Sequence, residues 1–261
     1  MMNRILFALF LFFTCTCFSQ PQFQLAPPML KYKSGFFSGK TSFEVIFNQP
    51  GAEVRYTLNG KEPTEKDPLY LRAVPITKRT VVKAKAFGKN FLPSETVTAS
   101  FIKDGKAIMR ASYSKPNESY ANSKPNLLHD NIGGQANYRS GTWVGFDSDT
   151  VTVDLELNKK QSINNVLISL LQDENSWIFL PEQILVYYFN DQQKVFVPLA
   201  KETFQFDTPG PKQVIVREIE PSASIKTKQL KLVFFPLKKI PDWHGGKGNH
   251  GWLFLDEIKV Y

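Results

Sequence analysis

Strict alternation of apolar and polar residues is the feature that most constrains this chain. The stretch TVTVDLELN places apolar side chains at every second position: Val151, Val153, Leu155 and Leu157. A period of two is that of a β-strand with one buried face. Similar runs follow along the chain, among them INNVLISLLQ, EQILVYYFN, KQLKLVFFPL and WLFLDEIKVY. The sequence therefore predicts an all-β protein.

The strand pattern and the charge divide the chain into two predicted domains. TSFEVIFN, AEVRYTLNG and TVVKAKAFG predict a small immunoglobulin/fibronectin-like antiparallel sandwich at 21–106, which holds 14 Lys and Arg against 7 Asp and Glu. Residues 107–261 hold 17 of each sign and predict a jelly-roll sandwich of seven or eight strands. The stretch 104–126, rich in Ser, Asn, Lys and Pro, is interpreted as the junction and the entry to the second domain.

Residues 1–20 are predicted to be a signal peptide. Arg4 precedes an apolar run that is too short to span a bilayer. This indicates export to the periplasm, the cell surface or the medium. Cys15 and Cys17 both lie in this segment, so cleavage after them leaves no thiol for disulfides, thiolate zinc sites or catalysis. Lipid attachment to either Cys is the alternative that stays open.

The segment PDWHGGKGNHG, which begins at Pro241, holds two of the three His residues of the chain. A metal site there would need further ligands, and the spacing of His244 and His250 is not diagnostic. A catalytic site would need paired carboxylates or an activated nucleophile. Asp256 and Glu257 are neighbours on a predicted strand and are expected to face opposite sides, so they are not expected to act as a pair.

The third interpretation is a carbohydrate-binding rim. Aromatic faces stack on sugar C–H groups while nearby polar groups bond the hydroxyls. The loops DENSW and PDWH both offer this combination, so the predicted carbohydrate-binding residues are Trp177, Trp243, His244, Asp173 and Asp242. The alternative that Trp177 and Trp243 are core residues stays open. Trp143 and Trp252 are expected in the core.

Short motifs in the first predicted domain resemble a known module. YTLNG at 56–60, EPT at 62–64, PI at 75–76 and KAF at 85–87 are similar to the pattern of the chitobiase/β-hexosaminidase C-terminal module, which is associated with fibronectin-III-like folds. Asn59 stands where that family usually has Asp. The resemblance implies a structural spacer and no functional residues.

Residues 126–261 resemble a discoidin, or coagulation factor V/VIII C-type, domain. The matching motifs are LHD at 128–130, GTWVG at 141–145, SWIFLP at 176–181, PDWH at 241–244 and WLFLDEI at 252–258. The tandem is similar to the tail of Bacteroidetes family 20 β-N-acetylhexosaminidases, whose catalytic barrel has no counterpart in this sequence. The resemblance implies sugar-binding loops and one structural calcium ion, with Asp130 and Glu257 as ligands.

These observations predict a secreted, non-catalytic carbohydrate-binding protein for amino-sugar or galactose-type glycans. Two alternatives remain: an accessory tail of a glycoside hydrolase system, with a hydrolase as partner, and a cell-surface adhesion module. No nucleic-acid partner and no transmembrane segment are expected.

Overall fold

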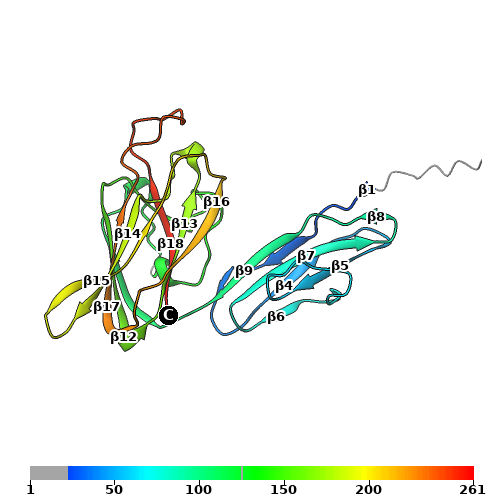
Figure 1. Cartoon of the computed structure of the whole chain (residues 1–261), viewed down its shortest axis with the longest axis horizontal. Coiled ribbons are helices and arrows are strands. Elements are labelled where there is room, and N and C mark those ends of the chain that lie inside the picture. The colour runs from blue at the N-terminus through cyan, green and yellow to red at the C-terminus, as the bar shows by residue number, and fades with distance from the viewer. Residues whose placement is uncertain (1–22, 125) are drawn as a thin grey trace, which may run out of the picture.

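The computed structural model describes residues 23–124 and 126–261, and it is all-β, as the alternation predicts. Two β-sandwich units follow one another along the chain (Figure 1). The predicted signal peptide, with Cys15 and Cys17, lies outside the described residues.

The first unit packs a three-stranded sheet on a four-stranded sheet. The smaller sheet has the order β2 (Met29–Tyr32), β4 (Thr41–Ile46), β6 (Val74–Ile76). The larger has the order β3 (Phe36–Phe37), β9 (Val97–Lys103), β7 (Thr80–Gly88), β5 (Ala52–Thr57). A short pair, β1 (Phe23–Gln24) with β8 (Phe91–Leu92), lies beside them.

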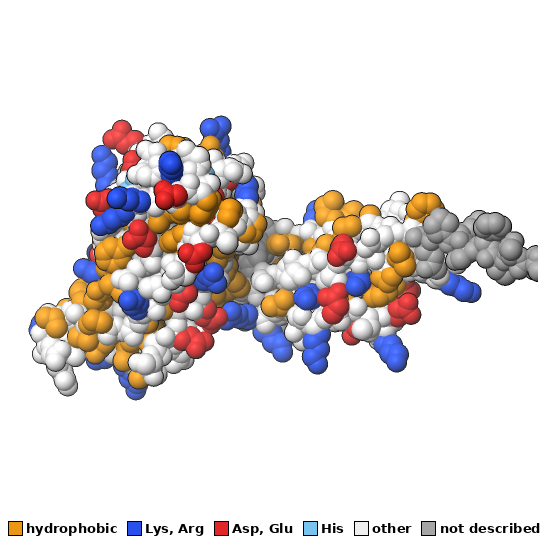
Figure 2. Space-filling view, turned by 45° about the horizontal axis from the view of Figure 1, so that its top comes forward, with side chains coloured by type: hydrophobic (Ala, Val, Ile, Leu, Met, Phe, Trp, Pro, Cys, Tyr) orange, Lys and Arg blue, Asp and Glu red, His pale blue; other side chains and the backbone are white. Residues whose placement is uncertain are grey.

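The inward positions of the first unit form its core. Phe43, Val82 and Phe101 are fully buried between the sheets, as the alternation of their strands predicts. The expectation of a purely antiparallel sandwich is wrong in two places, because β1–β8 and β3–β9 pair in parallel. Lys and Arg side chains project along one edge of this unit, whereas both signs mix on the second unit (Figure 2).

The second unit packs a five-stranded sheet on a four-stranded sheet. The larger sheet has the order β10 (Ile108–Tyr113), β12 (Val151–Ile163), β17 (Ile225–Phe235), β14 (Gln183–Asn190), β15 (Val195–Thr203). The smaller has the order β11 (Val144–Phe146), β18 (Leu253–Val260), β13 (Val166–Gln172), β16 (Gln213–Ile219). Three single 3₁₀ turns complete the described elements: η1 (Glu118–Tyr120), η2 (Leu127–His129) and η3 (Glu174–Ser176).

The core of the second unit lies between its two sheets. The alternate residues of β12 that the sequence places on one face are all buried there. Every residue of β13 and β18 is buried, so the smaller sheet is covered on its outer face as well. Trp143, which is 3% exposed, packs on Phe254 of β18 as part of that cover.

The predicted junction is shorter in the structure. β9 ends at Lys103 and β10 begins at Ile108, so part of the stretch interpreted as a linker is an edge strand of the larger sheet. This strand was missed because only one of its faces touches the core and none of its residues is fully buried. Across the described residues, no helix is long and apolar enough to cross a membrane.

The two units touch through a small apolar cluster. Phe36 and Ile102 of the first unit pack with Leu167, Val216 and Tyr261 of the second. We call this contact and its polar surround the joint. The Tyr261 hydroxyl donates to the carbonyl of Lys103 at 2.5 Å, across the joint.

An ion pair extends the joint at its rim. Both terminal nitrogens of Arg79 contact the Glu218 carboxylate, at 2.9 and 2.6 Å. The division of the chain into domains at 21–106 and 107–261 stays a prediction.

Candidate functional site

Three loops of the second unit meet in one depression of about 700 Å³. They follow β13, precede β16 and precede β18, and the first and last are the two loops predicted to bind carbohydrate. The depression is lined by residues from 173–177, 209–212 and 243–246. The loop between β17 and β18 lies at the opposite end of the sandwich from the C-terminus (Figure 1). We call this depression the indole site, because Trp177 and Trp243 line it.

Trp177 stands at the surface in a fixed backbone position. It closes η3 with a left-handed backbone, φ 61°, and the residue is 39% exposed. A left-handed conformation in a bulky residue is uncommon and requires support from the surroundings. The Trp177 N–H donates to the Glu174 carbonyl, and the Trp177 carbonyl accepts from the Trp252 N–H, both at 2.8 Å. The chain around Trp177 is therefore held by hydrogen bonds at both ends of the residue.

Gly246 of the opposite loop lies directly against the Trp177 ring. A Cβ atom at Gly246 would stand 2.7 Å from Cε2 of Trp177, closer than real Cβ atoms approach. Only glycine fits between the loop backbone and the ring at this position. The loop thereby supports one side of the indole, and Trp177 stays partly exposed.

Trp243 is also a surface residue rather than a plug of the core. The residue is 36% exposed, and its Nε1 donates to the carbonyl of Phe206 at 2.8 Å. The hydrogen bond fixes the ring direction and satisfies the only polar atom of the side chain. Of the two alternatives for Trp177 and Trp243, the surface position is the one found. Trp143 is buried, as expected, while Trp252 is only partly buried.

His244 presents a hydrogen-bond donor beside the two indoles. Its Nδ1 accepts from the Gly246 N–H at 2.9 Å, so the neutral ring carries its proton on Nε2. The ring packs edge-on against Phe179 with centroids 5.6 Å apart. Nε2–H is thus a positioned donor on the depression wall.

Asp173 lies at the indole site but is turned inward. It is 2% exposed, and its carboxylate accepts from Lys212 at 2.8 Å and from Ser176 at 3.1 Å. Its role in this arrangement is to tie the loops together. Asp242 is exposed and does not line the depression, so the structure does not bring it to the other four predicted residues.

Two residues of the indole site were missed in the sequence. Glu174 is 7% exposed and accepts from the Gly210 N–H at 2.8 Å and from Gln172 at 2.7 Å, which fixes the third loop. Lys212 keeps two ammonium hydrogens beyond its bond to Asp173. Lys212 follows the loop TFQFDTPGP, and nothing in that stretch shows that Lys212 reaches Asp173.

Asp256 and Glu257 face the same region, contrary to the expectation of opposite faces. In the pairing of β13 with β18, Ile168 faces Ile258 and Leu170 faces Leu255, so both acids stand opposite Ser169 alone. This two-against-one arrangement is a β-bulge, which re-aims side chains and interrupts the alternation. Both carboxylates then accept backbone N–H groups of one loop, Asn131 for Glu257 and Gly134 for Asp256.

The cluster of Asp130, Asp256, Glu257 and Lys259, which we call the acid cluster, lies beside the joint; Asp130 is half-buried and the other three are buried. Burial raises the pKa of Asp256 to about 8, helped by the charges of Glu257 and Asp130 and opposed by the Gly134 N–H. Oδ1 of Asp256 has no hydrogen-bond partner among the described residues. Burial also raises the pKa of Glu257 to about 7, although the Lys259 ammonium opposes the shift.

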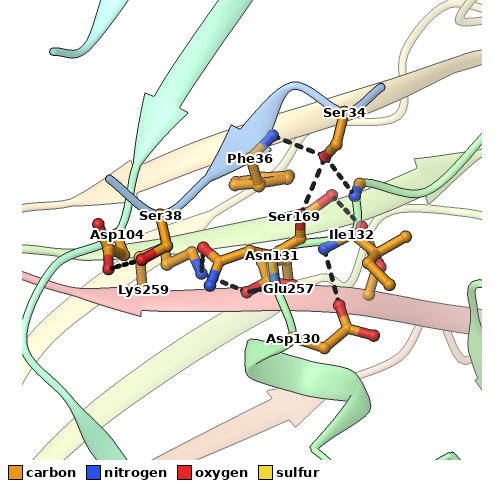
Figure 3. A network of polar contacts seen from close by, with 12 residues as sticks. Ser34, Phe36, Ser38, Asp104, Asp130, Asn131, Ile132, Ser169, Glu257 and Lys259 are labelled. Atoms are coloured by element: carbon orange, nitrogen blue, oxygen red, sulfur yellow. Dashed lines mark hydrogen bonds and ion pairs between the residues drawn. The ribbon is translucent and has the colours of Figure 1, made fainter. Parts of the chain in front are cut away.

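Asp130 and Glu257, as placed here, do not fit the predicted calcium ion. Calcium takes six to eight oxygen ligands, but Glu257 is bonded by the Lys259 ammonium and the Asn131 N–H, which are donors rather than ligands. Asp130 bonds the Ile132 N–H at 2.8 Å (Figure 3). Lys259, which is 4% exposed, is the cation beside these carboxylates. Calcium binding therefore stays a prediction without support from this geometry.

The His residues of the chain do not converge. His250 contacts Asp149 at 3.4 Å, and His244 lies in the indole site. Burial lowers the pKa of His129, with the nearby Lys259 charge adding to the shift. Over residues 23–124 and 126–261, no group of three or more His, Cys, Asp or Glu side chains is arranged to hold a metal.

Comparisons with known proteins bear on each unit separately. Residues 32–99 match the family model of the chitobiase/beta-hexosaminidase C-terminal domain. The resemblance noted for the first unit is confirmed by this match, which covers that unit and not the whole chain. A comparison with curated protein sequences gives no match.

Similar solved structures include carbohydrate-binding modules. A pectin-binding module shares 21% identity at TM-score 0.36, covering 60% of this chain and 91% of its own. The family 32 module of Clostridium perfringens NanJ, solved with galactose, shares 15% at TM-score 0.38, covering 58% and 91%. A chitosan-binding module of Paenibacillus sp. IK-5 shares 15% at TM-score 0.37, covering 58% and 93%. Function does not follow from fold likeness, so a ligand for this chain must be argued from its own site.

Proposed function

We propose that the second unit binds a glycan in the indole site. The observation that carries this proposal is the convergence of Trp177, Trp243 and His244 from two separate loops on one depression. Two partly exposed indoles offer apolar faces for the C–H groups of a pyranose. His244 and Lys212 offer hydrogen-bond donors for its oxygen atoms.

The polar side of the indole site favours ligands rich in acceptors. Asp173 and Glu174 are already bonded within the protein, whereas the Nε2–H of His244 and the free ammonium hydrogens of Lys212 are donors. An acetamido carbonyl or a ring hydroxyl is a suitable acceptor for them. We therefore propose amino-sugar or galactose-type glycans as the ligand class.

We further propose that the chain is exported and acts without catalysis, alone or beside a separate glycoside hydrolase. The carboxylate pair Asp256–Glu257 is fully buried, so a substrate has no access to it. Glycosidases need two accessible carboxyl groups that flank the scissile bond. The apolar start of the chain supports export, and lipid attachment through Cys15 or Cys17 remains the other proposal.

Substitution of Trp243 tests the site. In a calorimetric titration of the full chain with N-acetylglucosamine and galactose, we expect a Kd of about 1 mM, which corresponds to about 4 kcal/mol. Trp243→Ala should abolish this binding and leave the thermal midpoint nearly unchanged, because the ring is partly exposed. Phe23→Ala removes another exposed aromatic ring, 75% exposed, and should change neither quantity.

Two results would contradict the proposal. Unchanged sugar binding by Trp243→Ala would place the site elsewhere. A loss of about 3–5 kcal/mol of stability, as for a buried aromatic residue, would make Trp243 a core residue and the loss of binding indirect.

A further inference from the structure

A second aromatic depression adjoins the indole site. It measures about 240 Å³ and is lined by the aromatic residues Tyr120, Tyr138, Trp252 and Phe254, with Asn175 and Ser176 at its edge. We call it the tyrosine site. None of the predicted carbohydrate-binding residues lines it.

The rings of the tyrosine site are held rigidly. Tyr120 meets Trp252 edge-on at 5.2 Å between centroids and Tyr138 at 5.8 Å. Edge-to-face packing of this kind fixes ring orientation and adds to burial. The guanidinium of Arg139 lies 5.2 Å from the centre of the Tyr138 ring. The depression is thus a preformed aromatic surface with a cationic donor beside it.

Polar groups of the tyrosine site are free to bind a ligand. The hydroxyls of Tyr120 and Tyr138 make no hydrogen bond to another residue in the described part of the chain, and neither does the side chain of Asn175. Hydroxyl and amide groups each donate and accept. Aromatic rings with free hydroxyls beside them have the composition of a sugar subsite.

The indole site and the tyrosine site share one wall. Asn175 of the turn η3 lines both depressions, and Trp177 of one site bonds the backbone of Trp252 in the other at 2.8 Å. The side chain of Asn175 is exposed at the boundary. A ligand that fills both depressions would therefore pass over the Asn175 amide.

We propose that the two depressions are adjoining subsites and that the chain recognises a glycan of at least two sugar units. This inference rests on the proposed function of the indole site. One sugar unit occupies the indole site, the next occupies the tyrosine site, and the Asn175 amide bonds the oxygen atoms near the linkage. A second occupied subsite adds contacts that a monosaccharide cannot make.

Titration with saccharides of increasing length tests the inference. The probes are N-acetylglucosamine, N,N′-diacetylchitobiose, galactose and lactose, each added to the full chain. The disaccharide of the recognised sugar should bind at least about tenfold more tightly than the monosaccharide, a difference of about 1.4 kcal/mol.

Two variants in the tyrosine site should remove this gain. Tyr138→Phe should weaken the disaccharide toward the monosaccharide Kd and leave the monosaccharide Kd unchanged, because Tyr138 lines only the tyrosine site. Asn175→Ala, at the wall shared by both depressions, should weaken the disaccharide more than the monosaccharide. Both are small changes at surface groups without hydrogen-bond partners, so the fold should persist, and the thermal midpoint verifies this. Asn90→Ala, an exposed Asn of the first unit, is the matched control and should change nothing.

The outcomes separate the two proposals. Equal affinity for monosaccharide and disaccharide, or a gain that survives Asn175→Ala, would overturn the two-subsite inference and leave the indole site standing. Absence of binding by all four probes, with a glycan array also negative, would overturn the proposed function and this inference with it.

Discussion

The indole site and the acid cluster use carboxylates in opposite ways. At the indole site, Asp173 and Glu174 accept bonds from side chains and backbone of the neighbouring loops, and the loops that they tie leave two indoles partly exposed. At the acid cluster, Asp256 keeps a buried oxygen without a described partner. The first arrangement fixes the surface proposed to bind a glycan, while the second makes the stability of the packing depend on one cation and on pH. Binding and stability should therefore be separable by mutation.

The largest expected effect is the loss of Lys259. Lys259→Met leaves Glu257 buried without its counter-ion, which costs about 3–5 kcal/mol when one partner of a buried pair is removed. Chemical denaturation of the full chain measures this cost. Lys160→Met removes an exposed ammonium that pairs with Asp191 and should cost less than about 1 kcal/mol.

A second substitution at the same place sharpens this result. Adding Glu257→Gln to Lys259→Met removes the unpaired charge and should recover part of the loss. Sugar binding should persist in the folded fraction of both variants, because Lys259 does not line the indole site. A loss smaller than about 1 kcal/mol for Lys259→Met would mean that Glu257 is neutral or solvated in the protein.

The next effect is a fall in stability as the pH rises through neutrality. The pKa of Asp256, about 8, and that of Glu257, about 7, both lie above the unfolded values near 4. Carboxyl groups with raised pKa values stabilise the fold fully below pH 4 and lose this contribution as the pH rises through 7 to 8. Asp130, His129 and Lys259 also face this region. All three residues are retained in the variants used to measure the pH dependence.

Thermal midpoints at pH 6.5 and 8 measure this fall. One carboxyl changes the unfolding free energy by about 1.4 kcal/mol per pH unit, and 1 kcal/mol shifts the midpoint of a chain of this size by about 2–4 °C. Asp256→Asn should flatten the profile, while Asp207→Asn, far from the cluster, should leave it as it is. A midpoint that rises over this interval in the wild type would contradict the assignment.

The smallest effect concerns the ion pair at the rim of the joint. Arg79 holds the pKa of the Glu218 carboxyl below its usual value, chiefly through their hydrogen bonds. The Arg79 side chain is 53% exposed, so Arg79→Gln should cost less than about 1 kcal/mol. The apolar cluster of the joint should keep the two units together, which limited proteolysis at 104–107 would show. Rapid cleavage there in this variant would mean that the ion pair, not the cluster, holds the joint.

Much of the fold was predictable because alternation is a local signal. The strands around Val153 and Val82 follow it without interruption, and both residues are buried as expected. The edge strand β10 was missed because its pattern of partial burial leaves a weak alternation. Sequence patterns indicate strands best where one whole face is covered.

The candidate site was predictable in its residues but not in their roles. Trp177 and Trp243 were named from loop position, and both lie on one depression. The inward turn of Asp173 depends on Lys212, a partner 39 positions away, and no local pattern encodes such a contact. The tyrosine site gathers Tyr120, Tyr138 and Trp252 from three separate segments, so only the folded chain shows it.

The bulge at Asp256 and Glu257 also shifts the phase of the last strand. Before the bulge the odd-numbered residues Leu253 and Leu255 point into the core. After it the even-numbered residues Ile258 and Val260 point into the same core. Deleting one of these two acids would leave a single residue opposite Ser169, so the strand would regain regular pairing while Ile258 and Val260 stayed in the core. The loss of both acids, or the insertion of a further residue, would turn the later residues over and bring Lys259 to the core. The extra residue of the bulge thus directs two acids, rather than one, to the loop at 131–134.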